Sequence, residues 1–525
     1  MQNKREAYWG LGLGFFVAIL YSVFTNHIWE DFFITFRHSQ NLVEGHGLLY
    51  NAGERVHGFT SPLGVLVPAL LYWVSGAKSY IAALWLFRIL GALLFGWTAM
   101  LAWQMLRNKS ASAFAGMVFL SFFLFDVKAV AYSVNGMETG FMLFFLALAV
   151  SRLSQIREGD WKTLGIAASG LMWTRPDSFI YIAILLLSAI LFRWFEVKPH
   201  FATLVKGALC AAVLYLPWIL VAWWYYGTPI PNTVLAKGGG LHPHLLPTAF
   251  PMTLAQWTQV PFFKTAATPF LPIYFFLGGW PWWTEYWAEL LGALTAFYWL
   301  LPVADRMGRA SSFAFLLSVV YLSCIPPFPW YLVPAAFFGW IAVASAAAKA
   351  WSYTRKVQPW AFALPATALA AFVLLNAGFG LSNAYTMRIQ QQEVEFGNRK
   401  QIGLWLKENV KPTESIMLEP LGYVGYFSEA HMTDFPGLVS PAIVRLRESQ
   451  PGMTYRQVIE ATTPKWLVLR PGETSAFVEA HYDRAATFDI RNRLEMYRAL
   501  PGRGYLDFDS VFTVYRLRDG APTQG

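Results

Sequence analysis

The chain of 525 residues is 56% hydrophobic and 17% aromatic, and only 14% of its residues are charged. A soluble chain of this size would carry roughly a quarter charged residues, so the composition indicates a membrane protein. Cytoplasmic loops rich in Lys and Arg explain the net charge of +9 better than nucleic acid binding does. Cys210 and Cys324 both lie in apolar stretches without zinc-site spacing, so neither a disulfide framework nor a structural metal is indicated.

The first apolar run, residues 9–25, follows Lys4 and Arg5 and lacks the small-residue cleavage site of a secretory signal. We therefore expect it to be a retained first span with a cytoplasmic N-terminus. Residues from His27 onward then emerge on the outer side of the membrane.

Charge decides how the next apolar stretches are placed. Residues 62–77 are short and open with Ser-Pro, whereas residues 81–106 are long enough to cross the hydrocarbon core. If both crossed, the basic loops that follow would lie outside, against the positive-inside rule. We therefore expect residues 62–77 to be juxtamembrane or re-entrant on the outer face, and we predict about eleven spans. They lie near 9–25, 81–106, 111–126, 137–153, 162–174, 178–194, 201–224, 286–303, 310–325, 330–350 and 359–382.

This topology leaves a first outer loop, residues 27–80, and a second outer loop rich in Pro and Trp, residues 225–283. An odd number of spans also places the C-terminal segment outside, where charges become frequent from about Asn383. The predicted fold is a polytopic α-helical membrane protein, residues 1–383, followed by a soluble α/β domain, residues 384–525. In that domain a helical pattern at 388–409 precedes short β-like runs at 415–418, 466–470 and 511–516.

The densest cluster of charged residues on an outer face lies between His27 and Gly45. No Pro or Gly interrupts residues 30–44, so we expect a helix along the membrane surface that ends at Gly45. At helical spacing its carboxylates and Arg37 face one way, and its three phenylalanines lie largely between or opposite them. One side can then sit in lipid while the charges face a cavity. The alternative is an interfacial amphipathic helix whose charges are simply solvated.

Residues 45–62, which follow this helix, hold more Gly and hydrogen-bonding residues than a linker needs. The run from Glu30-Asp31 to Arg37, together with this segment, resembles the first outer loop of membrane glycosyltransferases of the GT-C fold. The most similar group is that of the mycobacterial terminal arabinofuranosyltransferases; aminoarabinose and protein O-mannosyltransferases are more distant. The resemblance covers nearly the whole chain, with further motifs at 133–139, 174–177, 226–237, 418–428 and 434–441.

The resemblance implies an enzyme of the bacterial inner membrane that takes a sugar from a polyprenyl-phosphate donor and passes it to an acceptor in the cell envelope. The acceptor is a glycan, a protein or a lipid on the periplasmic side, where the C-terminal domain also lies. The position that matches the family's general base is Asp31, and Glu30 shares or supports that role. The most similar group implies arabinofuranose as the sugar, and a hexose such as mannose remains an alternative.

Five further residues are candidates for binding the phosphate or the sugar of the donor. Arg37, beside His38, can pair bidentately with a phosphate or form a salt bridge within its own helix. Arg88 lies in the outer third of its span, where a charge is costly unless it is paired, faces a cavity or snorkels to the interface. Asn232 and Lys237 lie in the second outer loop, from which they can reach sugar hydroxyls or phosphate.

Two carboxylates are candidates for acceptor binding. Glu138 matches the acidic position of a second family motif, and helix capping is the alternative. Glu54 is a candidate as well, although an ion pair with Arg55 that holds the loop together is the favoured interpretation. We expect Arg175 and Asp177 to form a structural pair that breaks a helical pattern at the outer surface.

Four of the nine histidines lie in the first outer loop, but no pair has the i, i+4 spacing of a helical metal site. The single phosphate of a polyprenyl-phosphate donor can be neutralised by Arg without a divalent ion, so no cofactor is expected. Two other functions compete with the enzyme hypothesis. A transporter or lipid flippase would predict duplicated halves and charges in mid-span, and a scaffold protein would not explain the polar first loop.

The C-terminal domain holds a run of Gly and aromatic residues, 422–427, and an acidic residue, Asp434. Together they can bind an acceptor glycan, with the aromatic rings stacked on sugar faces. A buried turn between two strands is the alternative.

Overall fold

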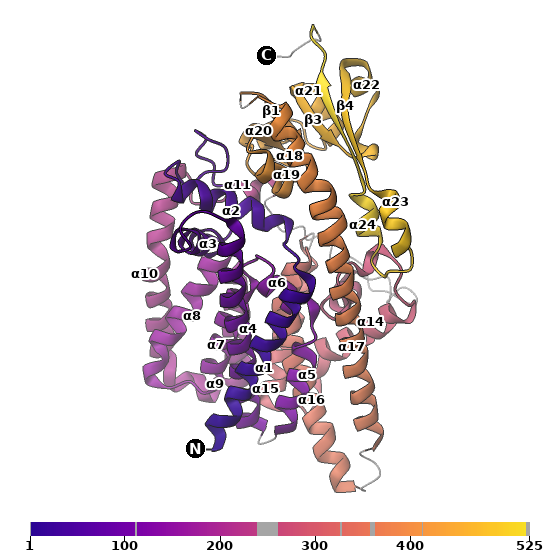
Figure 1. Ribbon diagram of the computed structural model, residues 1–525. Coiled ribbons are helices and arrows are strands. Elements are labelled where there is room, and N and C mark those ends of the chain that lie inside the picture. Colours follow the sequence, from indigo (N-terminus) through magenta and orange to yellow (C-terminus); the bar gives the residue numbers. More distant parts are fainter. Residues whose placement is uncertain are drawn as a thin grey trace.

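The computed structural model describes residues 2–110, 113–238, 261–325, 328–357, 363–411 and 413–520. A bundle of long helices forms one end of the molecule, and a small α/β domain covers the other end (Figure 1). The α-helices of the bundle and its loops are α1 (Gln2–Thr25), α2 (Glu30–Val43), α3 (Pro62–Val74), α4 (Tyr80–Ser110), α5 (Ala113–Phe123), α6 (Val127–Val134), α7 (Thr139–Ser154), α8 (Trp161–Thr174), α9 (Ser178–Val197), α10 (Phe201–Tyr226), α11 (Asn232–Ala236), α13 (Pro261–Ala267), α14 (Trp283–Phe297), α15 (Arg306–Leu322), α16 (Leu332–Val357) and α17 (Ala363–Ile389).

The long helices of the bundle run side by side, and each predicted span coincides with a helix (Figure 1). Within the described ranges, five helical stretches are long and apolar enough to cross a membrane, or six if a bent pair is counted as one span. That pair is α5 and α6, which meet at 65°. The chain is thus a polytopic helical membrane protein, while the count of about eleven spans stays a prediction.

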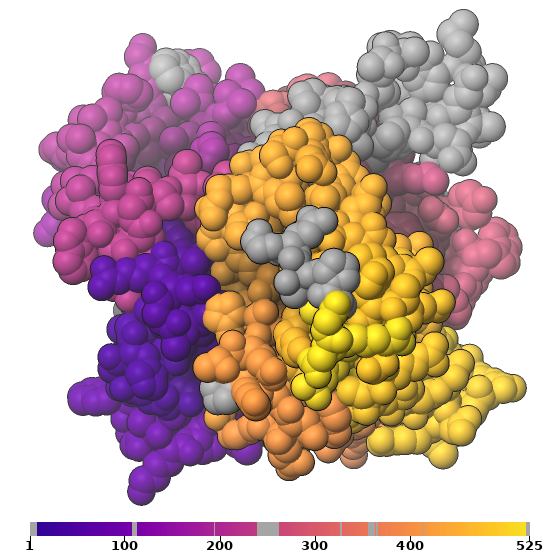
Figure 2. Space-filling view, turned by 90° about the horizontal axis from the view of Figure 1, so that it is seen from above, coloured from indigo at the N-terminus to yellow at the C-terminus, as the bar shows by residue number. Residues whose placement is uncertain are grey.

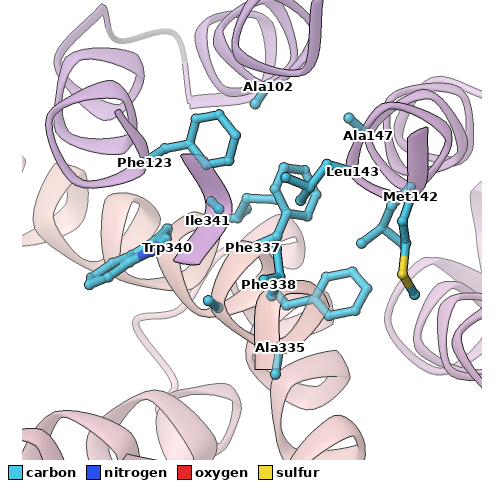
Figure 3. Packing of buried hydrophobic residues seen from close by; sticks show 14 of the residues in the cluster. Ala102, Phe123, Met142, Leu143, Ala147, Ala335, Phe337, Phe338, Trp340 and Ile341 are labelled. Atoms are coloured by element: carbon cyan, nitrogen blue, oxygen red, sulfur yellow. The ribbon is translucent and has the colours of Figure 1, made fainter. Parts of the chain in front are cut away.

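Aromatic and small side chains of α4, α5, α7 and α16 form the centre of the bundle. Figure 3 shows Phe337 of α16 pointing between Phe123 of α5 and Leu143 of α7, with Phe338 beside it toward Met142 of α7. Ala102 of α4 packs against the same cluster, and its small side chain lets the helices approach closely. Protein surrounds α16 on most sides, so α16 is the central helix of the bundle and the other helices pack around it.

The predicted outer segment at residues 62–77 forms α3, which packs against α2 and the first half of α4. The Ser61 hydroxyl accepts a hydrogen bond from the Gly64 N–H and caps the helix, and Pro62 occupies its first turn. Helix α2 begins at Glu30 and ends where Gly45 adopts a left-handed conformation, as the sequence predicts. Both helices lie at the end of the bundle that carries the C-terminal domain (Figure 1).

The C-terminal domain is a five-stranded mixed sheet with helices packed around it. Its strands follow the order β2-β1-β3-β5-β4, in which β1 pairs parallel with β2 and β3, and β5 pairs antiparallel with β3 and β4. Three of the strands were predicted, whereas β2 and β4 were not. The elements are α18 (Lys400–Asn409), β1 (Ser415–Leu418), α19 (Leu421–Ser428), β2 (His431–Asp434), α20 (Pro441–Ser449), α21 (Tyr455–Thr462), β3 (Trp466–Leu469), α22 (Ala476–His481), β4 (Tyr482–Asp489), α23 (Arg491–Leu494), α24 (Gly504–Phe508) and β5 (Val511–Leu517).

A ten-residue π-helix, Gln390–Arg399, joins α17 to α18 and so connects the bundle to the domain. π-helices are rare and frequently occur at functional sites. Gln391 in this segment accepts a hydrogen bond from the Ile28 N–H at 2.7 Å, just before α2 begins. The π-helix therefore faces the turn between α1 and α2.

The aromatic side of α2 is buried by protein, which corrects the expectation that it lies in lipid. Phe32, Phe33 and Phe36 are fully buried, and Phe33 packs on Tyr423 and Tyr426 of α19. Seen from the domain end, the C-terminal residues cover the centre of the molecule and lie against the N-terminal segment (Figure 2). The sequence pattern predicted the apolar face of α2 correctly. This face packs on the C-terminal domain and not on lipid.

Close packing of α19 on the first outer segment depends on two glycines. A Cβ atom at Gly422 would overlap the carbonyl of Glu30, and one at Gly425 would overlap the hydroxyl of Tyr50. The run of Gly and aromatic residues is thus a buried contact between the two parts of the chain, formed by a helix between strands β1 and β2.

Candidate functional site

Three adjoining cavities lie near the first turn of α2, which borders two of them, and we name them by their position. The lateral cavity, about 490 Å³, is lined by Arg175, Asp177, Lys237 and Arg447 and by apolar residues of α9 and α15. The central cavity, about 60 Å³, is lined by Asp31, Glu138, Arg175 and Lys237. The interdomain cavity, about 350 Å³, lies between the bundle and the C-terminal domain and includes Glu30, Asp31, Arg399 and Glu419. The lateral and interdomain cavities have the size of small-molecule sites.

Asp31 lies where the central and interdomain cavities meet. No described residue forms a hydrogen bond or an ion pair with its carboxylate. Burial raises the pKa of Asp31 above its ordinary value, and the positive charges of Lys237 and Arg175 oppose that rise. A carboxylate that is open to a cavity and has a raised pKa is suited to accept a proton from a substrate.

Glu30 is the neighbour of Asp31, but its carboxylate already has partners in the C-terminal part of the chain. It accepts hydrogen bonds from the Gly422 N–H at 2.5 Å and from Arg399 at 2.9 Å. Trp29, just before it, donates its indole N–H to the Ala131 carbonyl and stacks on Tyr132. These contacts fix the start of α2 and leave Asp31 as the carboxylate that faces the central cavity.

Glu138 and Arg175 form the wall of the central cavity opposite α2. Arg175 binds Asp177 at 2.9 Å, as the sequence predicts, and also lies 3.8 Å from the Glu138 carboxylate. The Glu138 side chain makes no capping hydrogen bond to α7, although the residue precedes that helix. The motif around Glu138 therefore supplies a buried carboxylate to the cavity rather than a helix cap.

Lys237 lines all three cavities. Its ammonium lies over the rings of Phe328 and Trp330, at 4.9 and 5.7 Å from the ring centres. Within the described part of the chain no carboxylate lies within ion-pair distance of it. The Lys237 ammonium, which has no ion-pair partner among the described residues, can therefore pair with an anion in the lateral or central cavity.

The wall of the interdomain cavity nearest the sheet is a network of buried ion pairs. Arg399, only 4% exposed, contacts Glu30, Glu395 and Asp509 together. Asp509 also binds Arg470 at 2.7 Å. Arg470 in turn contacts two further carboxylates, Glu419 and Glu473. The opposite walls carry aromatic rings, namely Trp29, Tyr132, Tyr274, Trp330 and Tyr505.

Three basic residues predicted to bind the donor do not line these cavities. Arg37 donates to the carbonyls of Gly425 and Ala430, at 2.6 and 2.8 Å, and thereby attaches α2 to the C-terminal domain. Arg88 is fully buried and donates to the Asn26 side chain and the His27 carbonyl. Burial lowers the pKa of His38 to about 4, so its ring is neutral and carries no charge for a phosphate.

Asn232 and Glu54 are also used in contacts between segments. The Asn232 amide donates to the carbonyls of Gly437 and Leu438, at 2.7 and 3.1 Å. Glu54 binds His431 at 3.0 Å, so the expected ion pair with Arg55 is not the contact that holds this loop. Neither residue lines the three cavities.

Arg399, Arg470 and Arg447 were not predicted to be cavity residues, because all three lie in a part of the chain where charged residues are frequent. Where the structure describes the chain, no group of three or more His, Cys, Asp or Glu side chains is arranged to hold a metal ion.

A family model described as a domain of unknown function (DUF8728) matches residues 384–515, which form the π-helix and most of the C-terminal domain. No curated protein matches the sequence of the chain.

Among solved structures, the chain is similar to ArnT from Cupriavidus metallidurans. The apo form aligns with 12% identity and a TM-score of 0.54 over 98% of each chain. The form bound to undecaprenyl phosphate aligns with 12% identity and a TM-score of 0.51 over 97% of each chain. The arabinofuranosyltransferase AftD from Mycobacteria aligns with 13% identity and a TM-score of 0.50, over 99% of this chain but 40% of AftD.

These similarities define the class of fold. The chain is a membrane protein with the GT-C fold, as the sequence motifs predict. Alignment with ArnT over almost the full length of both chains shows that the bundle and the C-terminal domain together correspond to one such fold.

Proposed function

We propose that the protein is a glycosyltransferase that moves a sugar from a polyprenyl-phosphate donor to an acceptor hydroxyl, with Asp31 as the general base. The observation that carries this proposal is the position of Asp31. Its unpaired carboxylate lies between a cavity with uncompensated positive charge and a cavity walled by aromatic rings and polar side chains. The undecaprenyl phosphate bound to ArnT supports a lipid of that class as the donor.

The lateral cavity suits the donor. Its polar end holds Arg175, Lys237 and Arg447, and its apolar lining includes Ile180 of α9 and Ile325 just beyond α15. A phosphate can lie beside the cations while the isoprenoid chain leaves between the two helices. The anomeric carbon then points into the central cavity, toward Asp31.

The interdomain cavity suits the acceptor. An acceptor hydroxyl there attacks the anomeric carbon while Asp31 takes its proton. The bond between the anomeric carbon and the phosphate oxygen breaks, and the polyprenyl phosphate leaves with the electron pair of that bond, so that it gains a second negative charge beside Lys237. Glu138, across the central cavity, is placed to accept hydrogen bonds from sugar hydroxyls. Glu30 holds the start of α2 in place through Arg399 and Gly422.

The identity of the sugar and the class of the acceptor are inferred from the sequence motifs, from the likeness to AftD and from the walls of the interdomain cavity. The sequence motifs and the likeness to AftD favour arabinofuranose, and a hexose such as mannose is the alternative. Aromatic walls and carboxylates favour a glycan as acceptor, before a protein or a lipid. Arg152 lies in the last turn of α7, and Arg306 and Arg309 lie in the first turn of α15, whereas the opposite ends of both helices border the cavities. This distribution supports a cytoplasmic position for that end and a periplasmic position for the C-terminal domain, in the inner membrane of a bacterium.

Transfer of radiolabelled sugar from polyprenyl-phosphate arabinofuranose and polyprenyl-phosphate mannose, measured with membranes that contain the full chain, tests the proposal. We expect Asp31→Asn to lower the rate by at least about 100-fold, as loss of a general base does. Glu44→Gln removes a carboxylate at the other end of α2, outside the cavities, and should transfer at the parent rate. A flippase would bind donor and transfer no sugar. Parent-level transfer by well-expressed Asp31→Asn protein would refute the role of Asp31.

A further inference from the structure

We propose that Arg447, in the domain of unknown function, binds the donor phosphate together with Lys237. This inference rests on the proposed donor role of the lateral cavity. It assigns to the C-terminal domain a direct part in substrate binding. The donor site is then assembled from two parts of the chain that are about 200 residues apart.

The charges around the lateral cavity identify the two residues. Arg175, Lys237 and Arg447 line it, with Asp177 as the accompanying acid. Asp177 accepts two hydrogen bonds from Arg175, at 2.9 and 3.2 Å, so that arginine is already neutralised. Neither Lys237 nor Arg447 has an ion pair with any described residue. The lateral cavity therefore has two positive charges, those of Lys237 and Arg447, that can pair with a bound anion.

The position of the Arg447 guanidinium is fixed by backbone groups. One of its terminal nitrogens donates to the carbonyls of Ala236 and Pro436, both at 2.9 Å. Ala236 directly precedes Lys237, so this contact holds the Arg447 guanidinium beside the backbone segment that carries Lys237. Such uncharged partners leave the positive charge in place, and the remaining N–H groups of the fork are suited to phosphate oxygens.

Asn232 strengthens the same junction. Its amide binds the carbonyls of Gly437 and Leu438, and its own N–H donates to the His57 carbonyl at 2.8 Å. The loop of the C-terminal domain that carries Pro436 is thus held against α11, and Arg447 is brought to the edge of the cavity. Asn232 acts as a positioning residue for this contact rather than as a ligand of the sugar.

The test measures the affinity of the purified full-length protein for undecaprenyl phosphate by native mass spectrometry. We expect Arg447→Gln to weaken binding by about tenfold or more, because a hydrogen bond to a charged group is lost. Arg445→Gln is the matched control, since Arg445 is exposed on the same helix and the substitution removes the same charge. It should bind with the parent affinity. Arg447→Lys should recover part of the loss.

Undecaprenol, which lacks the phosphate, separates binding of the anion from damage to the fold. If Arg447→Gln weakens undecaprenol binding as much as undecaprenyl phosphate binding, the effect is structural and the inference is wrong. It is also wrong if Arg447→Gln keeps the parent affinity while Lys237→Gln loses it, although the donor cavity then stands. If both variants keep the parent affinity, the lateral cavity is not the donor site, and that part of the proposed function fails.

Discussion

Asp31 is distinguished from the other carboxylates of the interdomain cavity by its lack of partners. Glu30, Glu419 and Asp509 each contact an arginine, whereas the Asp31 carboxylate is open to the cavities. Its burial raises its pKa, and Lys237 limits that rise. These two effects determine how the transfer rate should depend on pH.

A base acts only when it is deprotonated, so kcat/KM should rise with pH through the raised pKa of Asp31 and then level off. Lys237→Gln removes a charge that lowers this pKa, so the acid limb of its profile should move to higher pH. Arg445→Gln, far from the carboxylate, should leave the limb where it is in the parent. A limb that does not move in Lys237→Gln would show that another group titrates.

At the scale of single residues, the sequence indicated several residues that line the cavities, but it did not indicate which groups the other candidates contact. Asp31, Glu138 and Lys237, which the sequence proposed for three different roles, line one cavity. Arg37 does not, because its partners are backbone carbonyls of a domain that begins more than 340 residues later in the chain. Carbonyl acceptors have no sequence signature, so such contacts cannot be found without the fold. Arg447 was not predicted to be a site residue, because it lies among other charged residues on a surface helix and nothing in the sequence distinguishes it from them.

Among the elements, hydropathy located each long helix, and β-like runs located three of the five strands. The length and the ends of α2 were also predicted. Its surroundings were not, because an apolar helix face packs equally well on lipid and on protein. The decisive contact is with α19, where glycines allow the two helices to meet.

Gly422→Ala tests this contact between elements. The added methyl group would overlap the Glu30 carbonyl, so α19 has to move away from α2. We expect a loss of about 1–3 kcal/mol in stability, seen as a lower melting temperature in detergent, and slower sugar transfer. Gly472→Ala is the control, because its methyl group would meet open space. Equal melting temperatures for the two variants would contradict the packing argument.

On the scale of the whole molecule, the ion-pair network around Arg399 connects the bundle, the π-helix and the sheet. Arg399 comes from the π-helix, Glu30 from the start of α2, and Asp509 from the segment before β5. A buried charge is stable only when it is paired, so the three segments depend on one another. The C-terminal domain therefore helps to form the wall of the proposed catalytic site and is not an appended unit.

Arg399→Gln should disrupt this connection. It leaves Glu30, Glu395 and Asp509 without a shared counter-charge, which costs roughly 3–5 kcal/mol for a broken buried pair. We expect a marked fall in melting temperature in detergent and increased proteolysis at the junction of the two domains. Arg491→Gln breaks an exposed pair with Asp489 and should leave both unchanged. An equal response from both variants would show that the network does not hold the domains together.

The partners of Glu30 have a consequence for the order in which the protein is made. Glu30 leaves the ribosome early, but Arg399 and Gly422 follow it by 369 and 392 residues. Throughout that interval Trp29 holds the start of α2 through Ala131 and Tyr132, but the Glu30 carboxylate lacks both of these partners. A nascent or truncated chain would thus form much of the bundle without these two contacts at the start of α2. The proposed catalytic site is therefore complete only after the C-terminal domain has been made and has folded onto the bundle.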